Sequence, residues 1–131
     1  MQNSIAQIIT DAAQRYTNKT ALIIGDQQFS YERLDTLSNQ VANSLVAIGV
    51  SPGDRVTLYG ANAWEWVVSY YGILKTGAVV NPINVMLTPE EVAFVVEDCG
   101  AKAIIASKEK GLPLIGLETR TSIEKLILYQ P

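Results

Sequence analysis

The chain has 131 residues, of which 48% are hydrophobic and 18% are charged, a composition typical of a packed globular domain and unlike that of a disordered chain. Its formal charge is −3, with acids and bases interspersed, so no basic face for binding nucleic acid is expected. The sequence has no histidine and a single cysteine, Cys99. This excludes, within the chain, Ser-His-Asp and Cys-His catalysis, histidine-ligated metals, cysteine zinc sites and a disulfide.

No targeting or transmembrane segment is predicted. The N-terminus lacks a basic region followed by an apolar stretch, so a signal peptide is not expected. The most apolar stretch, residues 64–80, is interrupted by two charged residues and two glycines, and it is shorter than the ~20 apolar residues that a spanning helix needs. With the single free thiol, this favours a cytoplasmic location; peripheral association with a membrane is left open.

A helix and a hairpin are predicted first. Ser4 is spaced from Gln7 as in a capping box, and the apolar face of the helix that follows is expected to comprise Ile5, Ile8, Ile9, Ala12 and Tyr16. An apolar run at 21–24, a Gly-Asp turn at 25–26 and a second extended segment from Phe29 predict a small hairpin.

A long amphipathic helix and a strand come next. Ser30 is the expected N-cap and Gly49 the expected stop, and the inward stripe of the helix is Leu34, Leu37, Val41, Leu45 and Ile48. A Ser-Pro-Gly-Asp turn at 51–54 leads into residues 55–59, which are rich in β-branched residues and predict a strand.

A nearly all-apolar helix is predicted over residues 64–74. Asn62 and Glu65 are spaced as its N-cap and the partner of that cap, and Gly77 is its stop before a strand at 78–82. Because this helix has almost no polar face, we expect it to be buried on most sides.

Another helix starts with the strong capping sequence Thr-Pro-Glu-Glu at 88–91. Its inner face is expected to be Val92, Val95, Val96 and Cys99, with Gly100 as its stop. Strands are predicted at 103–106 and 123–129. Strands that alternate with helices form parallel sheets, so the sequence predicts an α/β fold: a three-layer, mostly parallel sheet with helices on both faces.

Two segments have the spacing of a phosphate-binding loop, and a third could hold an anion. Residues 72–77 and 111–116 have the GxxxxG spacing of a P-loop, but neither is followed by the Lys-Ser/Thr that binds phosphate and magnesium. The Tyr-Gly-Ala-Asn loop at 59–62 could bind an anion at a helix N-terminus or be an ordinary capped turn, which we favour.

Three further groups of residues admit a functional and a structural interpretation. Trp64, Trp66, Tyr70 and Tyr71 could line an acyl pocket, but helical spacing favours core or interface packing. Glu90 and Glu91 could be paired catalytic carboxylates, but their place in the first helical turn favours an interaction with the helix dipole. Cys99 is interpreted as an inert buried thiol.

Two segments resemble family motifs. Residues 29–34, Phe-Ser-Tyr-Glu-Arg-Leu, resemble the (L/F)(T/S)YxEL motif of the adenylate-forming (AMP-binding) enzymes, and residues 74–84, LKTGAVVNPIN, resemble their LKxGAxxxPxx motif. The resemblance covers residues 4–106, and other family features stand in the expected order at Ala42, Leu45, Gly49, residues 53–56, Asn62, Glu91 and residues 101–103. Asn84 after Pro82 is similar to the CoA-ligase branch rather than to peptide synthetases.

The resemblance implies the N-terminal part of an acyl-CoA synthetase, or long-chain fatty-acid–CoA ligase. The intact parent would use ATP, Mg²⁺ and CoA to convert a carboxylic (fatty) acid to an acyl-adenylate and then to a thioester. The family's phosphate loop, its later acidic residues and its C-terminal lysine are absent here. We therefore expect residues 1–131 to form a single α/β domain, an N-terminal fragment of a larger AMP-binding ligase domain. We expect no catalytic, cofactor-binding or metal-binding residues in it, and no activity of the chain alone.

The expected partners are the remainder of the parent ligase and a second copy of the chain. Self-association, for example by domain swapping, would use surfaces left exposed on the aromatic helix at 64–74 and on an open strand edge. The alternative function is a free-standing interaction or regulatory module derived from such an enzyme. A flavodoxin-like binder is a third possibility, but it needs a cofactor loop that the sequence lacks.

Overall fold

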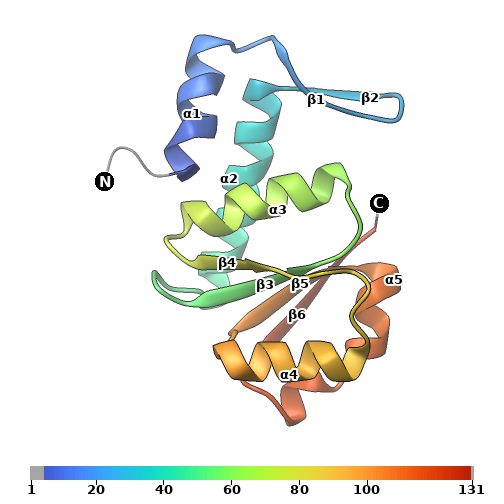
Figure 1. The fold of residues 1–131 in the computed structure, drawn as a ribbon. Helices are drawn as coiled ribbons and strands as arrows, with labels where there is room; N and C mark the ends of the chain where they lie inside the picture. Colours follow the sequence, from blue (N-terminus) through green and yellow to red (C-terminus); the bar gives the residue numbers. More distant parts are fainter. Residues whose placement is uncertain (1–4, 131) are drawn as a thin grey trace.

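The computed structural model describes residues 5–130, which form helices around two β-sheets (Figure 1). The elements in chain order are α1 (Ile5–Arg15), β1 (Thr20–Ile24), β2 (Gln27–Ser30), α2 (Tyr31–Ala47), β3 (Arg55–Tyr59), α3 (Trp64–Lys75), β4 (Val79–Pro82), α4 (Pro89–Cys99), β5 (Ala103–Ser107), α5 (Lys108–Gly111), the 3-10 turns η1 (Leu112–Leu114) and η2 (Leu117–Thr119), and β6 (Lys125–Tyr129).

The main sheet has four parallel strands in the order β4-β3-β5-β6, and β1 and β2 pair as an antiparallel hairpin. Helix α3 covers one face of the sheet, with α2, α1 and the hairpin stacked beyond it, and α4 covers the other face (Figure 1). The predicted α/β architecture with a parallel sheet and helices on both faces is confirmed.

Three apolar clusters hold these layers together. One lies between α4 and the sheet and includes Val92, Val96 and Ile104. A second lies on the α3 side of the sheet and includes Leu58 and Ile73. The third joins α1, the hairpin, α2 and α3. All five residues of β5 are buried, as expected of a central strand covered on both faces.

The helix boundaries follow local capping chemistry. Ser30 accepts a hydrogen bond from the Arg33 N–H at 3.1 Å, as predicted for the N-cap of α2. At α4 the Thr88 and Glu91 side chains each accept a hydrogen bond from the other's backbone N–H, at 3.2 and 2.8 Å, which completes the predicted capping box. Gly100 ends α4 in the left-handed conformation, with φ of 66°.

The predicted apolar face of α1 is partly wrong. Ile9 and Ala13 are buried, whereas Ile5 and Ile8 are 53% and 60% exposed. Helix α1 packs on α2 and α3 through the side that carries Thr10, whose hydroxyl donates to Asp35 of α2 at 2.9 Å. Because α1 has packing neighbours on one side only, part of its predicted apolar face remains exposed to solvent. The predicted capping residue Ser4 lies outside the described residues.

Helix α3 is the interior helix of the chain. None of its residues is exposed, and Ile73 is fully buried, which confirms the prediction from its apolar sequence. The expectation that this aromatic helix would leave an exposed surface is wrong, because α1 and α2 cover the side that the sheet does not (Figure 1). Strands β4 and β6 do have one free edge each within the described residues.

Candidate functional site

The loop at 59–62 lies beyond the carboxyl end of β3, the edge at which α/β sheets bind ligands. The Tyr129 hydroxyl at the end of β6 donates a hydrogen bond to the Ala61 carbonyl at 3.1 Å. A side chain at Gly60 would collide with that hydroxyl and lie 2.9 Å from the Ser107 backbone nitrogen, so the close approach requires glycine. The loop is therefore fixed against the ends of β5 and β6.

Helix α3 begins differently from the prediction. Its N-cap is Ala63, with no side-chain capping bond, so the predicted cap by Asn62 with Glu65 is wrong. Asn62 precedes the capping position by one residue because the fixed loop sets where the helix starts. The anion-binding interpretation of the loop remains an untested prediction.

A hollow of about 330 Å³ opens between α2, α3 and the ends of β5 and β6. Its lining is mainly apolar and includes Leu37, Val41, Trp64, Val68, Ile105 and Ile127. Glu65 and Tyr129 also line it, and Glu65 Oε1 is buried without a hydrogen-bond partner among the described residues. Burial raises the pKa of Tyr129 to about 12, and the charge of Glu65 adds to the shift. An unpaired carboxylate oxygen in apolar surroundings favours a cation or hydrogen-bond donor and repels an anion.

A second polar centre lies between helices α1, α2 and α3. Lys75 Nζ donates to Asp35 Oδ1 at 2.6 Å, Ser38 Oγ at 2.8 Å and Asn39 Oδ1 at 2.8 Å. The Lys75 side chain is 10% exposed and that of Asp35 is 20% exposed. Asp35 also accepts the hydroxyl of Thr10. This group of residues, the Lys75 network, joins three helices, and its members Thr10, Asn39 and Lys75 also line an open hollow of about 460 Å³.

A family model described as AMP-binding enzyme matches residues 9–130. The chain belongs to the AMP-binding enzyme family. It is 37% identical over 111 residues to the crotonobetaine/carnitine–CoA ligase of Citrobacter koseri, which covers 81% of this chain and 22% of that enzyme. It is 40% identical over 80 residues to the long-chain-fatty-acid–CoA ligase FadD13 of Mycobacterium tuberculosis. This match covers 61% of this chain and 16% of that enzyme.

Solved structures of the family show the same fold. The crystal structure of an anthranilate–CoA ligase in complex with anthranoyl-AMP matches 96% of this chain and 25% of its own chain, with a TM-score of 0.89 at 32% identity. The chain thus spans about a fifth of the length of the curated relatives, 22% and 16% of the two named above. The resemblance drawn from the two motifs is confirmed.

The two family motifs have structural roles in this chain. Residues 29–34 end β2 and start α2, one turn before Asp35, and residues 74–84 begin with Leu74 and Lys75 at the end of α3. The Lys75–Asp35 contact therefore joins the second motif to the helix that the first one starts. In β4, Asn81 Nδ2 donates to Thr57 Oγ1 at 3.1 Å and to Cys99 Sγ at 3.4 Å, tying β4 to β3 and α4.

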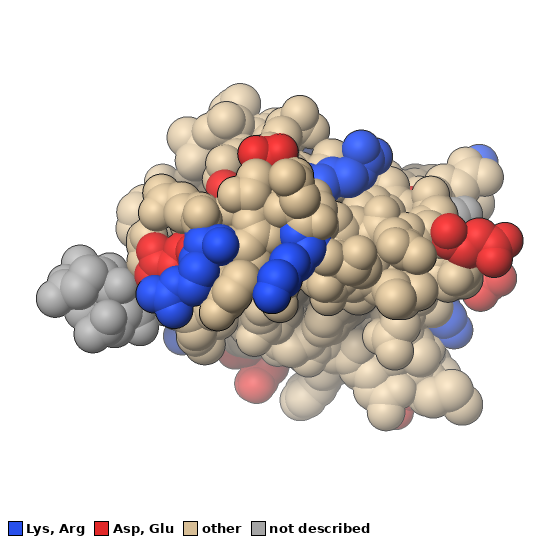
Figure 2. Space-filling view, turned by 90° about the horizontal axis from the view of Figure 1, so that it is seen from above, with Lys and Arg blue, Asp and Glu red and all other residues tan. Residues whose placement is uncertain are grey.

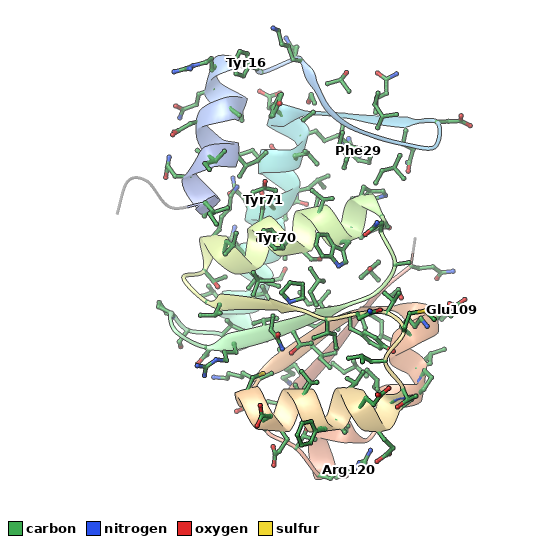
Figure 3. All side chains as sticks on the ribbon, viewed as in Figure 1. Tyr16, Phe29, Tyr70, Tyr71, Glu109 and Arg120 are labelled. Atoms are coloured by element: carbon green, nitrogen blue, oxygen red, sulfur yellow. The ribbon has the colours of Figure 1, made fainter. Side chains whose placement is uncertain are left out.

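The aromatic residues of α3 pack against both neighbouring clusters, as the core interpretation predicted. Trp64 lies 5.4 Å from the Phe29 ring of the hairpin, and Trp66 stacks on Tyr70 at 5.5 Å. Tyr70 and Tyr71 meet edge to face at 5.7 Å (Figure 3). Trp64 is also part of the lining of the hollow.

Glu90 and Glu91 have separate partners. Glu91 completes the capping box, whereas Glu90 forms a 3.0 Å ion pair with Arg120, which lies beyond α4 on the side away from the sheet (Figure 3). The hydrogen bond and charge of Arg120 hold the pKa of Glu90 below its ordinary value. Cys99 is half-buried, and its thiol donates weakly to the Val96 carbonyl at 3.8 Å.

Two of the four glycines with P-loop spacing are packing residues. Gly72 lies inside α3 against Val41 and Ser38 of α2, and Gly111 lies against Ala106 and Leu128. Among residues 5–130, no group of three or more His, Cys, Asp or Glu is placed to hold a metal ion, and no helix there is long and apolar enough to cross a membrane. On the face that carries α1, α2 and the hairpin, charges of both signs are scattered over a largely uncharged surface (Figure 2).

The sequence patterns did not indicate the two polar features. Glu65 was interpreted as a helix-capping residue, and Lys75 only as part of a motif. For the Lys75 network, the available sequence signal was that a lysine and an aspartate lie on two predicted helices that both carry motif residues. For the hollow, no sequence signal existed, because its lining comes from four separate elements.

Proposed function

We propose that this chain is the N-terminal portion of an ATP-dependent acid–CoA ligase of the cytoplasm. The intact enzyme would activate a fatty acid as an acyl-adenylate and transfer the acyl group to CoA, using ATP and Mg²⁺. The observation that supports this is the family match over residues 9–130, together with relatives named as CoA ligases for carnitine and for long-chain fatty acids.

We further propose that residues 1–131 form one α/β unit of a larger AMP-binding domain and contain no catalytic, cofactor-binding or metal-binding residue. The family motifs present here pack helices and strands, and the unpaired Glu65 Oε1 in the hollow would repel both a carboxylate and a triphosphate. The chemistry would be supplied by the remainder of the ligase.

Calorimetry with ATP, Mg²⁺ and a fatty acid tests the proposal that the chain alone neither binds ATP nor forms an acyl-adenylate. We expect no heat of binding and no acyl-adenylate. Micromolar ATP binding would contradict the proposal, because it would require a nucleotide site among residues that we assign to packing.

A chimaera tests the ligase assignment itself. In the Citrobacter koseri ligase, the matching 22% of the enzyme is replaced by this chain, and CoA-thioester formation is measured with the substrates of that ligase. We expect activity to be retained. A folded chimaera that binds ATP but forms no adenylate would show that this segment does not serve a ligase.

A further inference from the structure

The hollow between α2, α3 and the ends of β5 and β6 has a mainly apolar wall, which includes Val41, Trp64 and Ile127. Three other hollows have more polar walls. The one on α4 is lined by three acidic side chains and Arg120, the one between α1, α2 and the end of α3 includes Lys75, and the one on α1 includes an acidic and a basic side chain. Polar walls are well solvated by water, whereas an apolar wall gains free energy when apolar groups cover it.

The apolar hollow lies at the carboxyl edge of the parallel sheet. It reaches Tyr129, the last residue of β6, and Trp64 and Glu65, the first residues of the helix that follows β3. Loops from the carboxyl ends of parallel strands meet at this edge, and α/β enzymes assemble their ligand sites there. A ligase segment without catalytic residues of its own therefore needs the rest of the ligase to bring reactive groups to this edge.

The comparison with solved structures indicates how much of a ligase is available for this. The chain corresponds to 25% of the anthranilate–CoA ligase chain that has the same fold. Most of such an enzyme lies outside this unit, and it has to pack on some part of the unit's surface. An apolar hollow at the edge where ligand sites form is the part best suited to that contact.

Size and charge restrict what can fill the hollow. Its volume is about 330 Å³, roughly twice that of a 150 Å³ apolar cavity that holds one benzene molecule, so about two large side chains fit. The carboxylate of Glu65 in the wall disfavours an acidic group, and its Oε1 atom is already buried within this chain and is not available to a partner. Exposed Gln40 and Ser44 of α2 complete the lining. An apolar centre with polar residues beside it is the composition of a protein–protein interface.

We propose, resting on the function proposed above, that this hollow is the docking site for the remainder of the ligase. A segment of that remainder inserts about two large, uncharged aliphatic or aromatic side chains between α2 and the start of α3. These side chains cover Trp64 and Ile127 and keep water away from the carboxyl edge of the sheet. The docked segment is thereby held next to the place where the ligand site forms.

Cysteine labelling of the 131-residue chain and of the Citrobacter koseri chimaera tests the proposal. Ser44→Cys places a thiol in the lining of the hollow, and Asn43→Cys places one on the adjacent exposed residue of α2, which does not line it. Peptide mass spectrometry after reaction with a maleimide distinguishes these thiols from Cys99. We expect both thiols to react at similar rates in the isolated chain. In the chimaera, Ser44→Cys should react at least about tenfold more slowly, since a covered thiol reacts only after local opening, and Asn43→Cys should keep its rate.

Ser44→Trp gives a second and independent readout. The indole ring covers the apolar wall, so the midpoint of thermal unfolding of the isolated chain should not fall. In the chimaera the same ring occupies the space of the inserted side chains. We expect CoA-thioester formation to fall by about ten- to a hundredfold, as for a displaced active-site segment. Asn43→Trp adds the same ring at the neighbouring residue and should change neither quantity.

The outcomes separate this inference from the ligase assignment. An active chimaera in which Ser44→Cys reacts as fast as in the isolated chain overturns the docking site and leaves the assignment intact. So does an active chimaera in which Ser44→Trp and Asn43→Trp have equal effects. A folded chimaera without any substitution that binds ATP but forms no adenylate instead contradicts the ligase assignment itself.

Discussion

The helical layers on the two faces of the sheet are held by different interactions. On one face, α1, α2 and α3 meet around the partly buried Lys75 network. On the other face, α4 is fixed by the fully buried Val92 and Val96, and its ion pair, between Glu90 and Arg120, has side chains that are 79% and 53% exposed. One layer depends on a polar centre, and the other depends on apolar packing and helix caps.

This difference explains where the family motifs occur. The first motif lies in the layer of the Lys75 network, and the second motif begins there with Leu74 and Lys75 before it continues into β4. A buried charge that loses its partner is costly, so substitutions in the Lys75 network are expected to destabilise the fold strongly. Helix α4 needs only an apolar face and local capping signals, which many sequences provide.

The largest effect is expected for Lys75→Met. It leaves Asp35 partly buried beside a methionine, and Ser38 and Asn39 lose a donor. We expect a loss of about 3 kcal/mol in the free energy of unfolding, the lower part of the range for breaking a buried pair, because Asp35 keeps some contact with solvent. Urea denaturation measures it, with the exposed Lys108→Met as control.

A double-mutant cycle with Asp35→Ala separates the pair from lost packing. We expect the two changes together to cost less than their sum, as for residues in one network. Additive effects would mean that the Lys75 side chain acts through its aliphatic part, and the contrast between the layers would disappear.

A smaller effect is expected for Gly72→Ala in the contact of α3 with α2. The added Cβ would lie 2.5 Å from Val41 Cγ1 and 3.1 Å from the Ser38 carbonyl oxygen, distances that force the helices apart. Overpacking costs about 1–3 kcal/mol, against which alanine regains about 1 kcal/mol of helix propensity. We therefore expect a net loss of up to about 2 kcal/mol.

Thermal unfolding measures the Gly72 effect, with Asp98→Ala on the exposed side of α4 as the matched control. The control should lose nothing, since the carboxylate lies at the unfavourable C-terminal end of the helix dipole. Stabilisation by Gly72→Ala would contradict the close approach of α2 and α3.

The sequence predicted the features that local chemistry determines. The capping box at 88–91, the stops at Gly49 and Gly100 and the strands from 55 to 129 were correct, because their signals lie within a few residues. The strand order and the Lys75–Asp35 contact, which joins residues 40 apart, were not predicted, because they depend on which helix faces meet. The error at Asn62 has the same origin, since Tyr129, 68 residues away from Ala61, fixes that loop.

For the candidate site, the sequence predicted the packing and capping roles of individual residues but not the hollow that they surround. The aromatic residues of α3 and the capping role of Glu91 were correctly interpreted from helical spacing. The hollow was not predicted, because it forms where α2 and α3 fail to cover the ends of β5 and β6. A gap in packing leaves no pattern in the residues that surround it.

The smallest effect is expected for Arg120→Ala in the layer of α4. The Arg120 guanidinium forms an ion pair with Glu90 at 3.0 Å and lowers the pKa of Glu90. An NMR titration of the variant should therefore show a higher Glu90 pKa than in the parent. A lowered carboxylate pKa stabilises the fold above its unfolded pKa and loses this contribution as pH falls. Here, however, both groups are in solvent, where screening and side-chain entropy offset the attraction.

We therefore expect no measurable change in the denaturation midpoint between Arg120→Ala and the parent at neutral pH. A drop comparable to that of Lys75→Met would show that α4 also depends on a polar centre. A pKa shift without a loss of stability would show that it is the burial of a pair, and not its formation, that makes the Lys75 network indispensable to its layer.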